Sequence, residues 1–212
     1  MTERFALNRI STVQAVADSL RTRILDGDLA PAERLREVEL TEAYGVARHT
    51  LRSALQRLAA EGLVTIAPNR GASVASLDPA NAVPLFELRT ALEVEAARLA
   101  LERHGGRMPK PVHDAVRLMD AVCAQPDPPW SAVVEAHAAV HRAIVEAARS
   151  LRILRAYDAL AGELHLYVLR IRPAFPLDRM AAHHDDLLRG LETEGVEALR
   201  RHLAEGADSL SA

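Results

Sequence analysis

Two histidines of the chain, His137 and His141, lie four residues apart in a segment whose apolar residues recur at helical spacing. On a helix this spacing brings both imidazole rings to the same side, where they can share one metal ion. A metal site needs further ligands, and His183, His184 and His202 follow later in the chain. The residues by themselves leave two interpretations open: a divalent metal site, or histidines that lie on the surface or are hydrogen bonded in the core.

Two arginines, Arg48 and Arg52, are also four residues apart, and the leucines of the same segment point to the opposite side of the expected helix. A planar guanidinium group can donate two hydrogen bonds to a guanine edge or clamp a phosphate. His49 and Thr50 add short polar groups beside them, and Arg70 lies at the tip of an expected turn. These residues are suited to DNA contact. The alternative is a solvated arginine face on an ordinary helix.

The elements that must position these arginines are predicted by the pattern of the first 76 residues. Apolar residues at helical spacing indicate three helices, and two short apolar runs around a Pro-Asn-Arg-Gly turn indicate two strands. The helices are expected at Val13–Leu25, Val38–Tyr44 and Ala47–Glu61, and the strands at 63–66 and 72–75. Three helices and a two-stranded β-ribbon predict a winged helix-turn-helix, in which the second helix of the motif enters the major groove.

The rest of the chain changes character, because every long segment after residue 77 is helical in pattern and rich in alanine and leucine. Glycine pairs and proline clusters separate these segments. About six helices are expected, at 83–104, 110–124, 130–148, 151–171, 177–193 and 195–209. We therefore predict a mainly α protein with a winged helix-turn-helix in residues 1–76 and an all-α antiparallel helical bundle in residues 77–212.

Composition narrows the class of protein without naming a partner. The chain has 26 Lys and Arg residues against 29 Asp and Glu residues, so its net charge of -3 gives no sign of nucleic-acid binding. The single cysteine, Cys123, excludes a disulfide framework and a zinc ribbon. No apolar run approaches the ~18 residues that cross a bilayer, and the charged first residues do not form a signal peptide. We therefore expect a cytoplasmic protein with no membrane partner.

The first part of the chain resembles the winged helix of GntR-type bacterial regulators. The resemblance is carried by the segment LAPAERLREVELTEAYGVARHTLRSALQRLAAEGLVTIAPNRGASV, about 60 residues in its wider extent. It implies that DNA is contacted mainly by Arg48, Arg52 and Arg70, with Arg36, His49 and Thr50 as further contacts. The family usually has Ser-Arg-Thr-Pro in the turn where this chain has Ala47 to Thr50, so the serine hydroxyl that caps the helix is missing, a loss of about 1 kcal/mol.

The second part resembles the FCD ligand-binding domain of the FadR branch of these regulators. The segments FELRTALEVEAARLA, HAAVHRAIVEAARS and HDDLLRGLETEGVEALRRHL carry this resemblance. It implies a metal held by one Asp and three His, and His141, His184 and His202 match the histidine positions. His137 occupies the aspartate position, which would make the site all-histidine and suited to zinc or nickel. The sequence separation between His184 and His202 is 18 residues, which is shorter than the family usually shows by about the length of one helical turn.

Arg89 matches an arginine that, in the same family, is implied to face the effector cavity. An arginine beside a metal is a good receptor for a carboxylate, because it offers a two-pronged bond while the metal takes an oxygen atom. The alternative is a surface ion pair between Arg89 and Glu93, which lie at helical i,i+4 spacing.

Together these features predict a ligand-responsive transcriptional regulator, a repressor, rather than an enzyme. It is expected to bind double-stranded DNA as a homodimer at a palindromic operator, with a small organic acid as its effector. A metal-dependent enzyme is one alternative, but no carboxylate near the histidine pair in sequence is placed as a base. A DNA-binding protein without an effector is the other, and the large helical domain argues against it.

Overall fold

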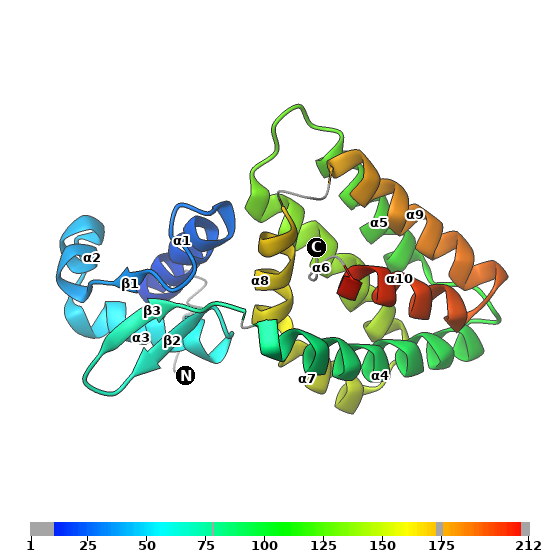
Figure 1. The fold of residues 1–212 in the computed structure, drawn as a ribbon, viewed down its shortest axis with the longest axis horizontal. Coiled ribbons are helices and arrows are strands. Elements are labelled where there is room, and N and C mark those ends of the chain that lie inside the picture. Colours follow the sequence, from blue (N-terminus) through cyan, green and yellow to red (C-terminus); the bar gives the residue numbers. More distant parts are fainter. Residues whose placement is uncertain (1–10, 78, 173–175, 209–212) are drawn as a thin grey trace, which may run out of the picture. The chain divides into compact units, whose positions relative to one another are not determined.

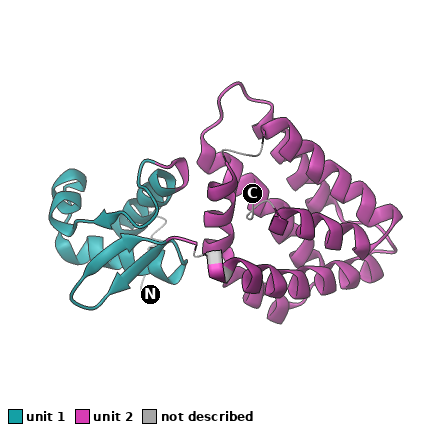
Figure 2. Ribbon diagram, in the orientation of Figure 1, with its two compact units in different colours: residues 1–24, 28–75 teal, residues 25–27, 76–212 magenta. Residues whose placement is uncertain are grey.

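A computed structural model describes residues 11–77, 79–172 and 176–208 (Figure 1). The chain forms two compact units, which are coloured separately in Figure 2. One unit extends to Ala75, and the other begins at Ser76 and also includes the short segment Leu25–Gly27. None of the described helices is both long and apolar enough to cross a membrane.

The first unit contains three helices and a small sheet, as expected for a winged helix-turn-helix. Its elements are α1 (Thr12–Asp26), β1 (Arg34–Leu35), α2 (Glu37–Tyr44), α3 (Arg48–Ala60), β2 (Val64–Ala67) and β3 (Gly71–Val74). The sheet is antiparallel with β3 in the centre, in the order β1-β3-β2. The prediction of a two-stranded ribbon was incomplete, because β1 adds a third strand. Two residues are too few to show the alternation by which a strand is found in a sequence.

Helix α3 packs as its sequence pattern predicts. Its apolar side chains Leu51, Ala54, Leu55 and Leu58 are buried. The residue before the helix, Ala47, is extended and makes no side-chain capping bond. Asn69, in the turn between β2 and β3, has φ 61°, and Gly71, the first residue of β3, has φ 81°; asparagine and glycine both tolerate this left-handed conformation. The chain thus reverses at the position predicted from the Pro-Asn-Arg-Gly segment.

The second unit is entirely helical in its described residues. Its helices are α4 (Pro79–Arg103), α5 (Lys110–Cys123), α6 (Trp130–Ala147), α7 (Leu151–Asp158), α8 (Ala161–Ile171), α9 (Leu177–Thr193) and α10 (Val196–Asp208). These are seven helices where about six were expected. The segment 151–171 is two helices, because the chain turns at Ala159 and Leu160 so that α7 packs against both α4 and α6. No proline or glycine lies between residues 151 and 161 to mark this break.

Helix α6 forms the centre of the second unit, with α4, α5, α7 and α8 packed against it. Helix α9 packs against α5 and α10, and α10 also packs against α4 (Figure 1). At Gly190 a Cβ atom would lie 2.7 Å from the Cβ of Ala198, so α9 and α10 approach more closely than a larger residue would permit. This packing turns one face of α6, α9 and α10 toward a common interior.

Candidate metal centre and DNA-binding surface

The exposed side of α3 carries the two arginines predicted to contact DNA. Arg48 is the first residue of α3, and Arg52 follows one turn later. The Nε of Arg52 donates to a carboxylate oxygen of Glu37 at 2.9 Å, which links α3 to the first residue of α2. Arg48 forms no ion pair with any residue that the structure describes. The same helix therefore presents one tethered guanidinium and one that is available to a partner.

A surface groove of about 600 Å³ lies beside this helix within the first unit. Arg36 and Arg48 both line it, and so does Gly71 at the start of β3. Arg70, in the turn of the ribbon, is exposed, and His49 and Thr50 are hydrogen bonded to each other at 3.3 Å. The structure thus places the sequence-predicted polar residues at the starts of α2 and α3 and at the tip of the ribbon, where all of them are exposed except Thr50, which is half-buried.

Four buried histidines from three helices meet in the interior of the second unit. His137 and His141 come from α6, His184 from α9 and His202 from α10. The ring centroids of neighbouring members lie 4.8–5.2 Å apart. The Nε2 atom of His141 lies 3.2 Å from Nε2 of His184 and 3.4 Å from Nε2 of His202. We call this group the histidine cluster.

The hydrogen bonds around the histidine cluster define where two of its protons are. His141 Nδ1 lies 2.8 Å from a carboxylate oxygen of Glu93, and His184 Nδ1 lies 2.8 Å from the carbonyl oxygen of Met180. Both partners accept hydrogen bonds, so in the neutral rings both Nδ1 atoms carry the proton. The two Nε2 atoms that face each other at 3.2 Å then both present lone pairs, an arrangement that favours a cation between them.

The cluster also has the electrostatic properties and the space that a metal site requires. Burial lowers the pKa of His184 to about 4, and it holds the pKa values of His137, His141 and His202 well below their ordinary value, so all four rings are neutral ligands near pH 7. A cavity of about 20 Å³ lies beside them, lined by His137, His184 and His202 among others. This volume suits one water molecule or ion. The nitrogen ligands of His137, His141 and His184 lie within 4.8 Å of one another.

Glu93, on α4, contacts the cluster and was not anticipated from the sequence. It is fully buried, and its Oε1 accepts a hydrogen bond from Nε of Arg89 at 2.6 Å while its Oε2 accepts from His141. Burial raises the pKa of Glu93, which the charge of Arg89 and the phenol of Tyr157 oppose. The expectation concerned a carboxylate close to the histidine pair in sequence that could act as a base, whereas Glu93 lies 48 residues from His141 and reaches the cluster through the packing of α4 against α6. The alternative of a surface ion pair was wrong, because the Arg89–Glu93 ion pair is buried.

A second cavity, of about 260 Å³, adjoins the histidine cluster at His137. It is enclosed by α4, α6, α7 and α8, and Arg89, Tyr157 and Leu164 contribute to its lining. At its edge Arg142 forms an ion pair with Asp158 at 2.9 Å. The cavity is large enough for a small metabolite, and a buried guanidinium and a candidate metal ligand both face it. We call it the inner cavity.

The comparisons with known proteins agree with this arrangement of two units. A family model described as bacterial regulatory proteins of the gntR family matches residues 12–74, and the FCD domain model matches residues 84–207. The chain is a GntR-family regulator with an FCD domain. This confirms the expected family and makes the protein a transcriptional regulator, not an enzyme. Regulators of this family bind DNA, and FCD domains bind small-molecule effectors and often a metal.

Relatives similar over most of their length are also regulators. The chain is 29% identical over 202 residues to the "Probable D-xylose utilization operon transcriptional repressor" of Paenarthrobacter nicotinovorans, covering 93% of this chain and 88% of that protein. It is 28% identical over 197 residues to the transcriptional repressor GlaR of Escherichia coli K12, covering 87% and 89%. A solved GntR regulator structure from Rhodococcus sp. RHA1 matches with a TM-score of 0.73 and 26% identity, covering 94% of this chain and 97% of that one.

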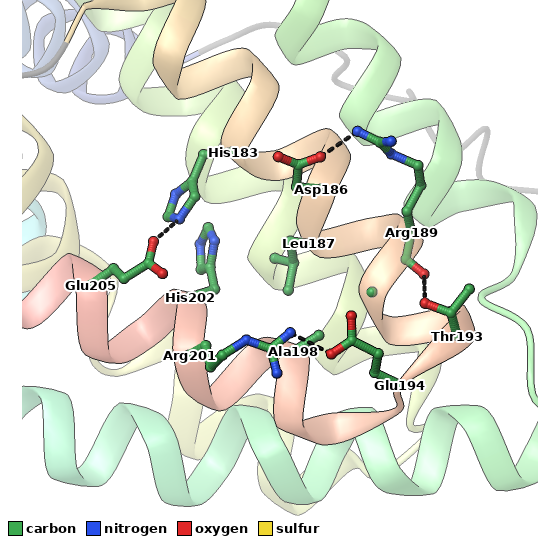
Figure 3. Close-up of a pocket in the computed structure, with 11 residues that line it drawn as sticks. His183, Asp186, Leu187, Arg189, Thr193, Glu194, Ala198, Arg201, His202 and Glu205 are labelled. Atoms are coloured by element: carbon green, nitrogen blue, oxygen red, sulfur yellow. Dashed lines mark hydrogen bonds and ion pairs between the residues drawn. The ribbon is translucent and has the colours of Figure 1, made fainter.

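The FCD domain has a further pocket of about 400 Å³ between α9 and α10 (Figure 3). His183 and Glu205 lie together on one side of it, with His183 Nε2 2.7 Å from a carboxylate oxygen of Glu205. The ring of His183 also stacks on His202, with centroids 4.2 Å apart. Two further ion pairs line the pocket, between Asp186 and Arg189 and between Glu194 and Arg201 (Figure 3). Since its charges are paired, this pocket offers no excess of positive charge to an anion.

The other histidines of the FCD domain lie outside the histidine cluster. His113 bonds to Glu192 at 3.1 Å, and His165 lines the inner cavity. No sequence signal distinguishes His165 from a core residue, and its place beside the cavity depends on the turn between α7 and α8. Nor could Glu93 be found from the spacing around His137 and His141, because it comes from a helix 48 residues earlier than its partner His141.

Proposed function

We propose that the chain is a repressor that binds a palindromic operator as a homodimer, with its affinity for DNA set by a small carboxylate bound beside a divalent metal ion. The proposed DNA-binding domain is residues 1–76, and residues 77–212 form the proposed effector-binding and dimerisation domain. DNA contact is assigned to the polar residues of the first unit named above, which are Arg36, Arg48, His49, Thr50, Arg52 and Arg70. Membership of the FadR branch is part of the proposal.

The proposed metal ligands are the four members of the histidine cluster, His137, His141, His184 and His202. Imidazole nitrogens suit zinc or nickel, and such an ion would supply a Lewis-acid position for one oxygen of a carboxylate. His141 and His184 are held in the correct tautomer by Glu93 and by the carbonyl of Met180. The residues present therefore fit a metal ion.

The observation that carries the proposal is the opposition of the His141 and His184 Nε2 atoms at 3.2 Å beside the inner cavity. The lone pairs of these atoms have no proton between them, which costs free energy unless a cation is bound. His137 lines both the 20 Å³ cavity and the inner cavity, so a ligand in the inner cavity would lie next to the ion. Arg89 would bind the carboxylate group of that ligand.

The first test measures the metal content of the whole chain. We expect the purified protein to bind one equivalent of zinc or nickel, and the His137→Ala, His141→Ala double variant to lose it. The control is His113→Ala, which changes a histidine outside the cluster. Unchanged metal content in the double variant would exclude this site.

The second test uses fluorescence anisotropy with DNA from upstream of the protein's own gene, at fixed salt. A screen of small organic acids is added to the metal-loaded protein. Light scattering of the DNA-bound form then measures the number of chains. The proposal predicts two chains per operator and an acid that changes the affinity. Failure to bind this DNA at low salt, or one chain per operator, would contradict it.

A further inference from the structure

Glu93 joins the two parts of the proposed effector site through its two oxygen atoms. Oε1 accepts from Arg89 at 2.6 Å and Oε2 accepts from Nδ1 of His141 at 2.8 Å, while the phenol of Tyr157 adds a third hydrogen bond. The side chains of Arg89 and Glu93 are 3% and 0% exposed, so bulk solvent screens their interaction little. A change in charge at the histidine cluster therefore alters the interaction of Glu93 with Arg89, and a change at Arg89 alters its interaction with His141.

The charges around the inner cavity cancel when no cation is bound. Glu93 neutralises Arg89, and Asp158 neutralises Arg142 at the edge. A carboxylate entering this cavity would lose its hydration and meet a lining with no net positive charge. Arg89 alone does not make the cavity an anion receptor, since Glu93 already neutralises its charge.

We propose that Glu93 is a positioning residue that makes carboxylate binding depend on the metal, an inference that rests on the proposed function. It has two effects. As a hydrogen-bond acceptor it holds His141 with Nε2 free for the ion, and second-shell carboxylates of this kind strengthen metal binding. As a buried negative charge it suppresses anion binding by Arg89 until a divalent cation supplies the missing positive charge.

Removal of the charge should change these two properties in opposite directions. In Glu93→Gln the amide keeps the size of the side chain, and its oxygen can still accept one hydrogen bond. We expect the affinity for zinc to fall by about 10- to 100-fold. In the metal-free variant the guanidinium of Arg89 is left without its counter-charge, so a carboxylate should now bind there. A merely loosened structure would weaken both interactions.

The experiment uses the full chain, zinc and acetate as probes. Zinc affinity is measured by competition with a chelator, and acetate binding by the shift in melting temperature at constant ionic strength, with and without zinc. Acetate should stabilise the wild-type protein only when zinc is present, and should stabilise Glu93→Gln without zinc. Glu135→Gln is the matched control, since Glu135 lies on the exposed side of the same helix as His141. It should behave as the wild type does.

Two results would overturn the inference: an unchanged zinc affinity in Glu93→Gln, or no effect of acetate on the metal-free variant. If Glu93→Gln does not fold, Glu93→Asp replaces it. The shorter carboxylate keeps the negative charge beside Arg89 but cannot also reach His141. It should therefore weaken zinc binding without permitting acetate binding in the absence of metal. An unchanged zinc affinity would again contradict the inference. If the wild-type protein binds no zinc at all, the proposed function fails, whereas the acetate measurement on metal-free Glu93→Gln still tests the charge compensation by itself.

Discussion

Acidification of the metal-free protein should lower its stability through the histidine cluster. The four rings are buried and neutral in the folded protein. In acid they take up protons when the chain unfolds, so acid favours the unfolded state. Burial is the largest cause of the low pKa of His184, and electrostatic repulsion from the neighbouring His183 acts in the same direction. The hydrogen bond to the carbonyl of Met180 opposes both. The perturbation is therefore a fall in pH in the presence of a chelator.

The size of the effect follows from the pKa values of His184 in the two states. Its pKa is about 6.5 in an unfolded chain and about 4 in the fold. Between these values the unfolded state binds more protons, so the free energy of unfolding falls as the pH falls from about 6.5 to about 4. A difference of about 2.5 pKa units at roughly 1.4 kcal/mol per unit gives a loss of about 3.5 kcal/mol. His137, His141 and His202 act in the same direction.

Trp130 provides the assay, because it is the only tryptophan and lies at the start of α6, only 6% exposed. Its fluorescence in urea therefore reports the unfolding of the FCD domain. The free energy of unfolding is measured across this pH range for the wild-type protein and for His184→Gln. The variant should show a shallower dependence, by about 1.4 kcal/mol per pH unit. Equal pH dependence in the two proteins, or a wild-type protein that gains stability in acid, would refute the reasoning.

Three further predictions concern single contacts. Arg48→Ala should weaken operator binding by about 1–3 kcal/mol in an anisotropy assay at fixed salt. The control is Arg57→Ala, farther along the same helix. An equal loss of affinity in the two variants would contradict the assignment of Arg48 to DNA contact. Ala47→Ser should raise stability in urea by about 1 kcal/mol by supplying the missing cap, and no gain would show that the cap is not limiting. Gly190→Ala should cost about 1–3 kcal/mol by crowding Ala198, and Ala198→Gly in the same chain should restore the melting temperature.

The sequence predicts an element well where its residues interact with one surface along its whole length. Helix α3 is the clearest case, because Leu51, Leu55 and Leu58 repeat at helical spacing and all are buried. Strand β1 is too short for any periodicity, and its pairing with Ala72 and Ser73 depends on a segment far along the chain. The break between α7 and α8 has no glycine or proline to mark it, since it is imposed by packing against other helices.

The candidate site shows the same division between local and distant information. The spacing of His137 and His141 is local and predicts that they share a side of α6, and their rings lie 4.8 Å apart. His184 and His202 were placed with them only by resemblance to a family. Glu93 was missed because neither spacing nor the family pattern connects it to His141. A buried carboxylate 48 residues away becomes visible only when the helices are packed.

The substitution of His137 for the family's usual aspartate gives Glu93 a larger part than it would otherwise have. An aspartate ligand would itself offset part of the charge of a divalent ion. Four neutral imidazoles offset none of it, so the compensating charge would come from Glu93, which contacts His141 and is already shared with Arg89, and from an anion in the inner cavity. The bound carboxylate should therefore tighten metal binding by the same factor by which the metal tightens carboxylate binding. A chain with histidine at this position should accordingly show stronger mutual dependence of metal and effector than its His137→Asp variant.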